Sequence, residues 1–440
     1  MLVACGGALP DTGDAGDAAA DVAKKDVSAP DAADAADASD GGTGLGVNVS
    51  GDGPGYESED QIAVAPDGTI AVLWQAFTQG PPYIAMRYAF STDGGKTFST
   101  PQAVSTPNTL YPGDPALTVD AAGNFWASYL GIAYSGQTLS FSNVYVAEAP
   151  HGSTTFGAPV EVSAPNNTQA LNDHPKIFAT KSGALLVGWA NFPTPDATTT
   201  TGVVARSPDG TTWTRTNVVD NTEAQFSNFL WFCEGASHVY LTFLEATSEL
   251  VIGARSSADD GVTFTTSSVA VSAPSDEIAA LDPACAADGD DVWVMYATTQ
   301  NPSVDETTID GADHIWVAHS GNDAQTFDTS HVDALDTAAS TLGTLPLIAR
   351  DATGKLDVAY VAGSSSGDPN GSIRFTRSDG ATASPSTFVD GPMTFDLSRV
   401  DAAWLGDYFG GVAFGGSFYL AYPRNETGLD HIYFAKMPLP

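Results

Sequence analysis

The chain has 440 residues, of which 42% are hydrophobic and only 16% charged, so it can form a sizeable core but offers few residues for charged surface helices. Its 53 acidic and 16 basic residues give a formal net charge of −37, which excludes nucleic acid as an expected partner because a polyanion would be repelled. The low charged fraction, together with abundant glycine, favours many short strands joined by turns. The net charge is interpreted as serving solubility, with cation binding or attraction of a basic partner as the alternative.

The first residues resemble the end of a bacterial lipoprotein signal. Leu2-Val3-Ala4-Cys5 is similar to a lipobox, in which Cys5 becomes the lipidated first residue of the mature chain. Residues 1–5 are therefore interpreted as a truncated signal, since the basic and apolar regions that normally precede a lipobox are missing. Gly6 is not an inner-membrane retention residue, so the resemblance implies an outer-membrane lipoprotein or an extracellular bacterial protein.

Residues 6–45 form a segment rich in alanine and aspartate, with no aromatic residue and no hydrophobic period. Such a segment cannot bury enough apolar surface to offset the loss of chain entropy on folding. We expect a disordered tether between the anchor and a folded domain that covers residues 46–440.

Seven alternating apolar segments follow at intervals of 53 to 64 residues, and each contains an aromatic residue in the same register. The aligned aromatics are Trp74, Tyr129, Trp189, Phe243, Tyr296, Tyr360 and Tyr422. An apolar stretch and a short turn, such as Asp67-Gly68, precede most of them, and two further strand-like stretches follow. Four strands per repeat are typical of a β-propeller blade, so the sequence predicts an all-β, seven-bladed propeller.

The seventh repeat ends after its third strand, whereas "GVNVS" (residues 46–50) stands alone before the first repeat. We expect this N-terminal segment to supply the outer strand of the seventh blade, which would close the ring and remove an exposed edge. The alternatives are a free N-terminal strand beside an incomplete last blade, and a six-bladed ring if the weakest repeat does not form a blade.

A second pattern lies between the third and fourth strands. "STDGGKTF" (Ser91–Phe98) recurs as "SADDGVTF" (Ser257–Phe264), and "SPDGTTW" with Asp209 and Trp213 is one residue shorter. The carboxylates of Asp93 and Asp259 can accept backbone N–H bonds across such a turn. Gly95 and Gly261 suit a positive φ, and Phe98 and Phe264 can pack on neighbouring strands.

These turns resemble the Asp box, S-x-D-x-G-x-T-W/F, of the sialidase-like, BNR-repeat propellers, and the resemblance covers residues 46–440. In that family the boxes are structural and lie on the face opposite the ligand site. The resemblance therefore directs attention to the other face, where the chain enters each innermost strand.

Acidic residues recur in the segments that lead into these innermost strands, which we expect to be loops. Five of the seven segments place an aspartate at what the sequence indicates are equivalent positions: Asp60, Asp114, Asp173, Asp282 and Asp407. His174, Tyr408 and Arg399 are added as candidate ligand-binding residues on the same face. One interpretation is that each aspartate caps its own loop. The other is a ring of carboxylates that binds polyhydroxyl ligands or a cation.

Sialidase activity does not follow from the resemblance. Sialidases hold the substrate carboxylate with three arginines, the first in an Arg-Ile-Pro motif, and this chain has "EDQIAVA" in that place. Tyr408 is the nearest match to a tyrosine nucleophile. Two functions stay open: a cell-surface module that binds glycans or a protein through an acidic channel mouth, or an exo-acting glycoside hydrolase that uses two rim carboxylates. Its catalytic pair would come from the same five aspartates.

No set of histidines and cysteines has zinc-type spacing, so no metal site is assigned. His174 beside Asp173 is interpreted as a loop cap, with a proton shuttle or a metal ligand as the alternatives. A divalent cation such as calcium could bind the acidic rim. The expected partner is a glycan or a surface protein, the membrane is contacted only through a lipid anchor, and the chain is expected to be a monomer. Cys233 and Cys285 fall on inner strands of consecutive repeats. They form either a disulfide or two buried free thiols.

Overall fold

The computed structural model describes residues 46–51, 53, 55–78, 83–107, 110–136, 138–164, 168–220, 226–246, 250–271, 278–299, 314–340, 342–363, 370–394, 406–425 and 429–440. The lipobox-like residues and the expected tether lie outside this part of the chain, as does Arg399. Within the described residues there is no helix that is long and apolar enough to cross a membrane.

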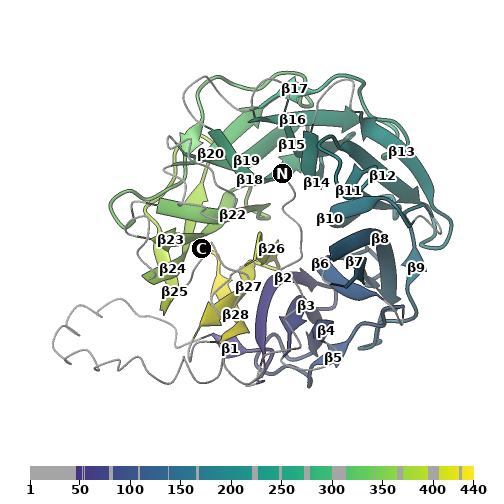
Figure 1. Ribbon diagram of the computed structural model, residues 1–440. Coiled ribbons are helices and arrows are strands. Elements are labelled where there is room, and N and C mark those ends of the chain that lie inside the picture. The colour runs from purple at the N-terminus through teal and green to yellow at the C-terminus, as the bar shows by residue number, and fades with distance from the viewer. Residues whose placement is uncertain are drawn as a thin grey trace.

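The described chain folds into seven antiparallel sheets of four strands each, arranged around a central axis (Figure 1). The predicted seven-bladed β-propeller is confirmed. Each of the first six blades is built from four consecutive strands, so that the first strand lies at the axis and the fourth at the rim.

The strands of the first four blades have the following bounds. Blade one contains β2 (Tyr56–Val64), β3 (Ile70–Phe77), β4 (Ile84–Ser91) and β5 (Gln102–Ala103). Blade two contains β6 (Tyr111–Val119), β7 (Phe125–Ser135), β8 (Thr138–Ala149) and β9 (Val160–Glu161). Blade three contains β10 (Leu171–Ala179), β11 (Leu185–Phe192), β12 (Thr201–Ser207) and β13 (Thr214–Val219). Blade four contains β14 (Phe226–Glu234), β15 (Val239–Ala246), β16 (Leu250–Ser257) and β17 (Val269–Ala270).

The last three blades complete the ring. Blade five contains β18 (Ile278–Asp288), β19 (Asp291–Thr299), β20 (His314–Ser320) and β21 (Val332–Asp333). Blade six contains β22 (Leu342–Arg350), β23 (Leu356–Gly363), β24 (Asn370–Ser378) and β25 (Thr387–Thr394). Blade seven contains β26 (Gly410–Phe414), β27 (Ser417–Asn425), β28 (Asp430–Pro438) and, as its outer strand, β1 (Val47–Asn48).

The ring is closed by the N-terminal strand, as predicted. Val47 pairs with Phe434 and Asn48 with Tyr433, so β1 runs antiparallel to β28. The N–H of Val49 and the hydroxyl of Ser50 continue the contact with Ile432 at 2.8 and 3.0 Å. In Figure 1 the purple strand β1 lies beside the yellow strand β28, so both ends of the folded chain belong to one blade.

All seven aligned aromatics are buried. The tyrosines among them also use their hydroxyl groups to hold the outer part of a blade. Tyr129 donates a 2.6 Å hydrogen bond to the carbonyl of Ser105, and the hydroxyl of Tyr296 lies 2.7 Å from Nδ1 of His331. The repeated aromatic therefore contributes apolar burial in every blade and a polar link in several.

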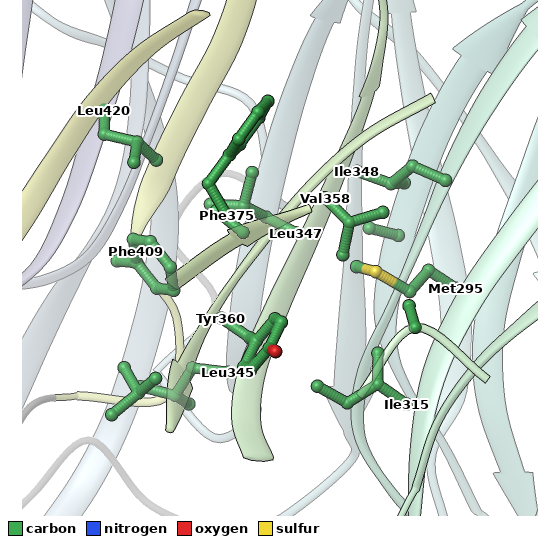
Figure 2. Packing of buried hydrophobic residues seen from close by; sticks show 14 of the residues in the cluster. Met295, Ile315, Leu345, Leu347, Ile348, Val358, Tyr360, Phe375, Phe409 and Leu420 are labelled. Atoms are coloured by element: carbon green, nitrogen blue, oxygen red, sulfur yellow. The ribbon is translucent and has the colours of Figure 1, made fainter. Parts of the chain in front are cut away.

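The core lies between the faces of adjacent blades. One cluster joins blades five, six and seven, where alternate side chains of neighbouring sheets interdigitate (Figure 2). Its labelled members are Met295, Ile315, Leu345, Leu347, Ile348, Val358, Tyr360, Phe375, Phe409 and Leu420. Equivalent clusters lie between the other blades, so each blade is stabilised mainly by its two neighbours.

The turns that resemble the Asp box fasten the third strand to the element that follows it in blades one, three and four. In blade one the carboxylate of Asp93 accepts the N–H groups of Lys96 and Thr97 at 3.0 Å and the hydroxyls of Ser91 at 2.8 Å and Thr97 at 2.6 Å. These bonds, led by those from Thr97, hold the pKa of Asp93 below its usual value. Phe98 packs edge-on to Phe434 of blade seven with ring centroids 5.3 Å apart.

The other boxes follow the same plan. In blade four, Asp259 accepts the N–H of Thr263 at 2.8 Å and its hydroxyl at 2.7 Å, and Phe264 packs beside the blade-four core. In blade three, Asp209 accepts the N–H groups of Thr211 and Thr212, and the indole of Trp213 donates to the carbonyl of Gly210 at 3.3 Å.

Blades four and five are also joined covalently. Cys233 of β14 and Cys285 of β18 form a disulfide, with Cα atoms 5.7 Å apart and 52 positions between the residues in sequence. Of the two alternatives left open by the sequence, the structure has the disulfide. Both residues are buried in the core between these blades.

Candidate functional site at the channel mouth

The Asp boxes and the hairpins between first and second strands share one face of the ring. Ser182, in the inner hairpin of blade three, donates a 2.7 Å hydrogen bond to Asp260 in the box of blade four. His151 and Asp67, 3.1 Å apart, connect blades two and one in the same way. The start of each innermost strand therefore lies on the opposite face, and we call that end of the central channel the mouth.

Each innermost strand of the first six blades has an irregular turn near its start. In β2, for example, the pairing with β3 shifts between Ser58 and Gln61. The irregularity places a non-glycine residue at a φ of 47° to 53° in five strands: Glu59, Asp114, His174, Phe229 and Leu345. Residues other than glycine rarely adopt this conformation, and it recurs at the same register position in all five strands.

The strand register corrects the expected equivalence of the five aspartates. To compare blades, one reference residue is taken on each innermost strand: the residue that pairs with the position just before the aligned aromatic of the same blade. In blades one, two, three and seven these residues are Gln61, Ala116, Lys176 and Gly410. Asp60 lies one residue before this reference, Asp114 two, and Asp173 and Asp407 three. The prediction of five equivalent aspartates is therefore wrong, because the bulge gives successive positions different directions. Asp60, Asp114 and Asp173 also lie within strands rather than in loops.

The centre of the candidate site is the imidazole of His174, which is fully buried. Its Nδ1 lies 3.1 Å from an oxygen of Asp173, and its Nε2 lies 3.0 Å from an oxygen of Asp407. Asp407 belongs to the segment before β26, so this contact crosses the channel from blade three to blade seven. Phe229 of blade four stacks against the imidazole with ring centroids 4.1 Å apart.

Asp114 and Asn228 extend this group into blades two and four. The backbone N–H of His174 donates to Asp114 at 3.0 Å, and the backbone N–H of Asp114 donates to the side chain of Gln75 at 3.2 Å. The amide of Asn228 donates to Asp173 at 3.1 Å, and its oxygen lies 3.3 Å from Nδ1 of His174. Three of the predicted aspartates thus meet around one histidine: Asp114, Asp173 and Asp407.

These contacts set the charge of the histidine. Burial by itself lowers the pKa of His174, but the negative charge and hydrogen bonds of Asp173, followed by those of Asp407 and Asp114, outweigh it. The net result is a pKa well above the ordinary value for histidine.

Glu59 of blade one completes the group. It is fully buried, and neither of its carboxylate oxygens has a hydrogen-bond partner among the described residues. Burial, and then the charges of Asp114 and Asp407, raise its pKa well above the usual value. The sequence analysis selected Asp60 but not its neighbour Glu59. The strand register reveals Glu59, because it lies two residues before the reference position, the same place as Asp114 and His174.

Asp60 has a separate environment. It is fully buried, and one of its oxygens accepts the N–H of Gly410 from blade seven at 3.1 Å. Burial raises the pKa of Asp60 to about 8, although the bond from Gly410 lowers it. This residue holds β2 against β26, and no contact of its side chain with His174 is found among the described residues.

Tyr408 and Lys176 contact each other and are close in sequence to this group, since Tyr408 follows Asp407 and Lys176 lies two residues after His174. The buried hydroxyl of Tyr408 donates to the carbonyl of Pro115 at 2.9 Å, which fixes the residue across the axis from blade two. The ammonium of Lys176 lies 3.1 Å from the centroid of the Tyr408 ring and 4.8 Å from that of Trp231. The channel continues below as a cavity of about 350 Å³, lined in part by residues 61–64, 116–119 and 176–179.

Two other predicted residues cannot be placed at the site. Asp282 lies in β18, two residues before Ala284, but its side chain is outside the described part of the structure, as is the whole of Arg399. Arg424, also near this face, instead binds both oxygens of Asp390 at 3.0 and 2.9 Å, where blade seven meets blade six.

Together the fold and the site define a seven-bladed β-propeller with a buried, carboxylate-rich group at the mouth of its channel. No protein-family model and no curated protein matches the sequence.

Several solved structures share the architecture. An ulvan lyase of polysaccharide lyase family PL25, bound to -[GlcA(1-4)Rha3S]-, matches with a TM-score of 0.55 at 11% identity over 90% of this chain and 94% of that one. A Dyadobacter fermentans protein of unknown function gives 0.53 at 14% identity over 90% and 98%. The α-L-arabinofuranosidase Arb93A from Fusarium graminearum gives 0.52 at 14% identity over 90% and 98%. At these identities the similarity shows the propeller fold that the Asp boxes implied.

Proposed function

We propose that the protein binds glycans at the mouth of its channel, with Asp173 and Asp407 as the acceptors of sugar hydroxyl groups. The observation that carries this proposal is the position of His174, which fixes one carboxylate from blade three and one from blade seven on its two ring nitrogens. Fixed carboxylates bind hydroxyl groups well because they lose little side-chain entropy on binding.

The choice of a carbohydrate as ligand is supported by the structural comparisons as well. The ulvan lyase and the arabinofuranosidase, which share the fold, are both named for reactions on carbohydrates. The net charge of −37 favours neutral glycans over those that carry carboxylate or sulfate groups.

A glycan array probed with the full chain tests this function, followed by calorimetric titration with the glycans that bind. We expect neutral oligosaccharides to bind, and Asp173→Asn and Asp407→Asn to weaken binding roughly 10-fold or more, since each loses a hydrogen bond to a charged acceptor. Asp290→Asn, an exposed carboxylate in the inner hairpin of blade five, is the matched control. Unchanged affinity in both folded mouth variants would refute the site, and an array without binding would favour a protein ligand.

The second candidate is a glycoside hydrolase, and the same contacts favour it. The two carboxylates are held on the two nitrogens of one imidazole ring, at 3.1 and 3.0 Å, as an acidic pair of fixed geometry. Glycosidase pairs of this kind work at separations of about 5–5.5 Å or 6.5–9.5 Å. In this case the wild type releases reducing sugar from a glycan that it binds. Asp173→Asn and Asp407→Asn would then abolish release while keeping measurable binding. Binding without any release by the wild type would leave the binding function alone.

We further propose that the protein acts outside the cytoplasm, as a lipid-anchored or extracellular monomer. The disulfide between Cys233 and Cys285 supports an oxidising compartment. Labelling of cells with an alkyne fatty acid tests the anchor, since wild type but not Cys5→Ala would be labelled. Equal labelling of both would refute Cys5 as the lipidated residue.

A further inference from the structure

We propose that Asp114, Asp173 and His174 bind a divalent metal ion, which ties together blades two and three at the channel mouth. One oxygen of each carboxylate and one ring nitrogen of the histidine lie within 4.8 Å of one another, and all three residues are buried. Ligand atoms around a single ion have about this mutual spacing, because metal–oxygen and metal–nitrogen bonds of roughly 2.0–2.4 Å surround a common centre.

Glu59 is an independent indication of a ligand. Its carboxylate has no exposed surface, and both oxygens lack a hydrogen-bond partner among the described residues. The charges of Asp114 and Asp407 raise its pKa and those of His174 and Lys176 lower it, so Glu59 lies beside the same group. A buried carboxylate without hydrogen-bond partners is costly, and a cation held by Asp114, Asp173 and His174 lowers that cost.

The surroundings of His174 are those of a metal-binding histidine. Such a histidine normally donates its second ring nitrogen to a carboxylate, which fixes the orientation of the ring. Here Nε2 lies 3.0 Å from Asp407, while Nδ1 points toward Asp173 and Asn228. An ion at Nδ1 would replace the proton on that nitrogen, and the oxygen of Asn228 lies near enough to join the coordination.

The charges in this part of the molecule also call for a cation. Four acidic side chains are buried together: Glu59, Asp114, Asp173 and Asp407. Lys176 supplies one positive charge that acts on Glu59, and its ammonium also lies over the rings of Tyr408 and Trp231. A divalent ion compensates two negative charges where water cannot.

The ligand set identifies the class of metal. Calcium, which sequence reasoning considered for the acidic rim, prefers six to eight oxygen ligands. A site with one imidazole and two or three carboxylates suits Mn²⁺ or Zn²⁺ better, since imidazole is a good ligand for zinc and carboxylate for manganese. The inference concerns binding alone and does not depend on the glycan function.

The test uses the full chain, stripped with a chelator and dialysed separately against Mn²⁺, Zn²⁺, Ca²⁺ and Mg²⁺. Elemental analysis then gives the bound equivalents, and thermal unfolding gives the shift in Tm. We expect about one equivalent of Mn²⁺ or Zn²⁺, with a Tm raised by several degrees because the ion binds only the folded state.

Asp114→Asn should lose the bound equivalent and the Tm shift. Because it removes a buried charge and could prevent folding, Glu59→Gln serves as a second, nearly isosteric variant, with at least roughly 10-fold weaker binding expected. Asp290→Asn is the control and should bind as the wild type does. No bound ion and no Tm shift with any of the four metals would overturn the proposal, as would full binding in a folded Asp114→Asn variant.

Discussion

Nε2 of His174 and a carboxylate oxygen of Asp407 lie 3.0 Å apart, although 233 positions separate the two residues in sequence. The contact joins blade three to blade seven across the axis of the ring. Most contacts in a propeller connect neighbouring blades, so a bond across the axis couples parts of the ring that are otherwise linked only through several blade interfaces.

Removal of the histidine should therefore be costly. His174→Asn leaves Asp173 and Asp407 buried without their shared partner, and we expect a loss of about 3–5 kcal/mol in the free energy of unfolding. Urea denaturation measures this loss. His151→Asn removes an exposed histidine paired with Asp67 and should cost about 1 kcal/mol or less. Similar losses for both variants would mean that the contact across the axis contributes no more than a surface ion pair.

The buried carboxyl of Asp60 predicts a specific pH dependence. Its pKa in the folded protein, about 8, is above the usual value of 3.8, so the folded state binds this proton more tightly than the unfolded state does. The contribution of Asp60 to the free energy of unfolding is fully present below about pH 4 and is lost as the pH rises toward 8. Asp60→Asn keeps an acceptor for the N–H of Gly410 and cannot ionise.

We expect Asp60→Asn to match the wild type near pH 4.5 and to exceed it in the free energy of unfolding near pH 8.5, by an amount on the order of a few kcal/mol. The measurement is the difference in urea midpoint between wild type and Asp60→Asn at each pH. The other acidic groups titrate in both proteins, so their contributions cancel in this difference. A difference that stays constant with pH would contradict the assigned pKa.

Substitution of two adjacent glycines in the turn of blade one allows the cost of backbone strain to be measured separately from the cost of overpacking. Gly94 and Gly95 both have a positive φ, 78° and 88°. A Cβ on Gly94 meets nothing within 4 Å, whereas a Cβ on Gly95 would overlap the ring of Phe434. Gly94→Ala should cost about 1 kcal/mol from strain, and Gly95→Ala a further 1–3 kcal/mol from overpacking. Thermal or urea unfolding measures both, and the gap should narrow when Phe434 is replaced by leucine.

The disulfide between blades four and five should contribute substantially to stability. It closes a loop of 52 residues, for which the restriction of the unfolded chain predicts about 4 kcal/mol. The Cys233→Ser/Cys285→Ser double variant should lose this amount in guanidinium denaturation, and a reductant should lower the stability of the wild type but not of the double variant. Equal stability of wild type and variant under oxidising conditions would show that the blade interface holds without the bridge.

The fold could be predicted because its determinants repeat. The aligned aromatics define the blade period, and the turns at Asp93 and Asp259 recur at matching places in two blades. The role of "GVNVS" (residues 46–50) followed from a count of strands. The seventh repeat had only three strands, and this segment was the one strand that belonged to no repeat. Buried strand positions and hairpin turns depend on short stretches of sequence. A repeat protein contains each such stretch several times, so the pattern can be recognised even where one copy is weak.

The site was harder to predict because it depends on single residues. Asp114, Asp173, His174 and Asp407 meet at one face, but the sequence analysis aligned the aspartates by residue type rather than by register. A bulge changes the direction of each residue after it, and no sequence pattern marks its position to one residue. Glu59 and Lys176 were missed for this reason, since only the strand pairing brings them to the axis beside His174.

The pairing of β1 with β28 has a consequence for biosynthesis. Strand β1 is made before every other strand of the ring, while its partner β28 (Asp430–Pro438) is made after them. Six blades can assemble in order as the chain emerges, but the ring stays open until β28 has been made. During that time the faces of blades one and seven, and the free edge of the first-made strand, are exposed to other chains. Ring closure is thus a late step that depends on the whole chain, and nascent chains that stall before residue 430 should be the aggregation-prone species.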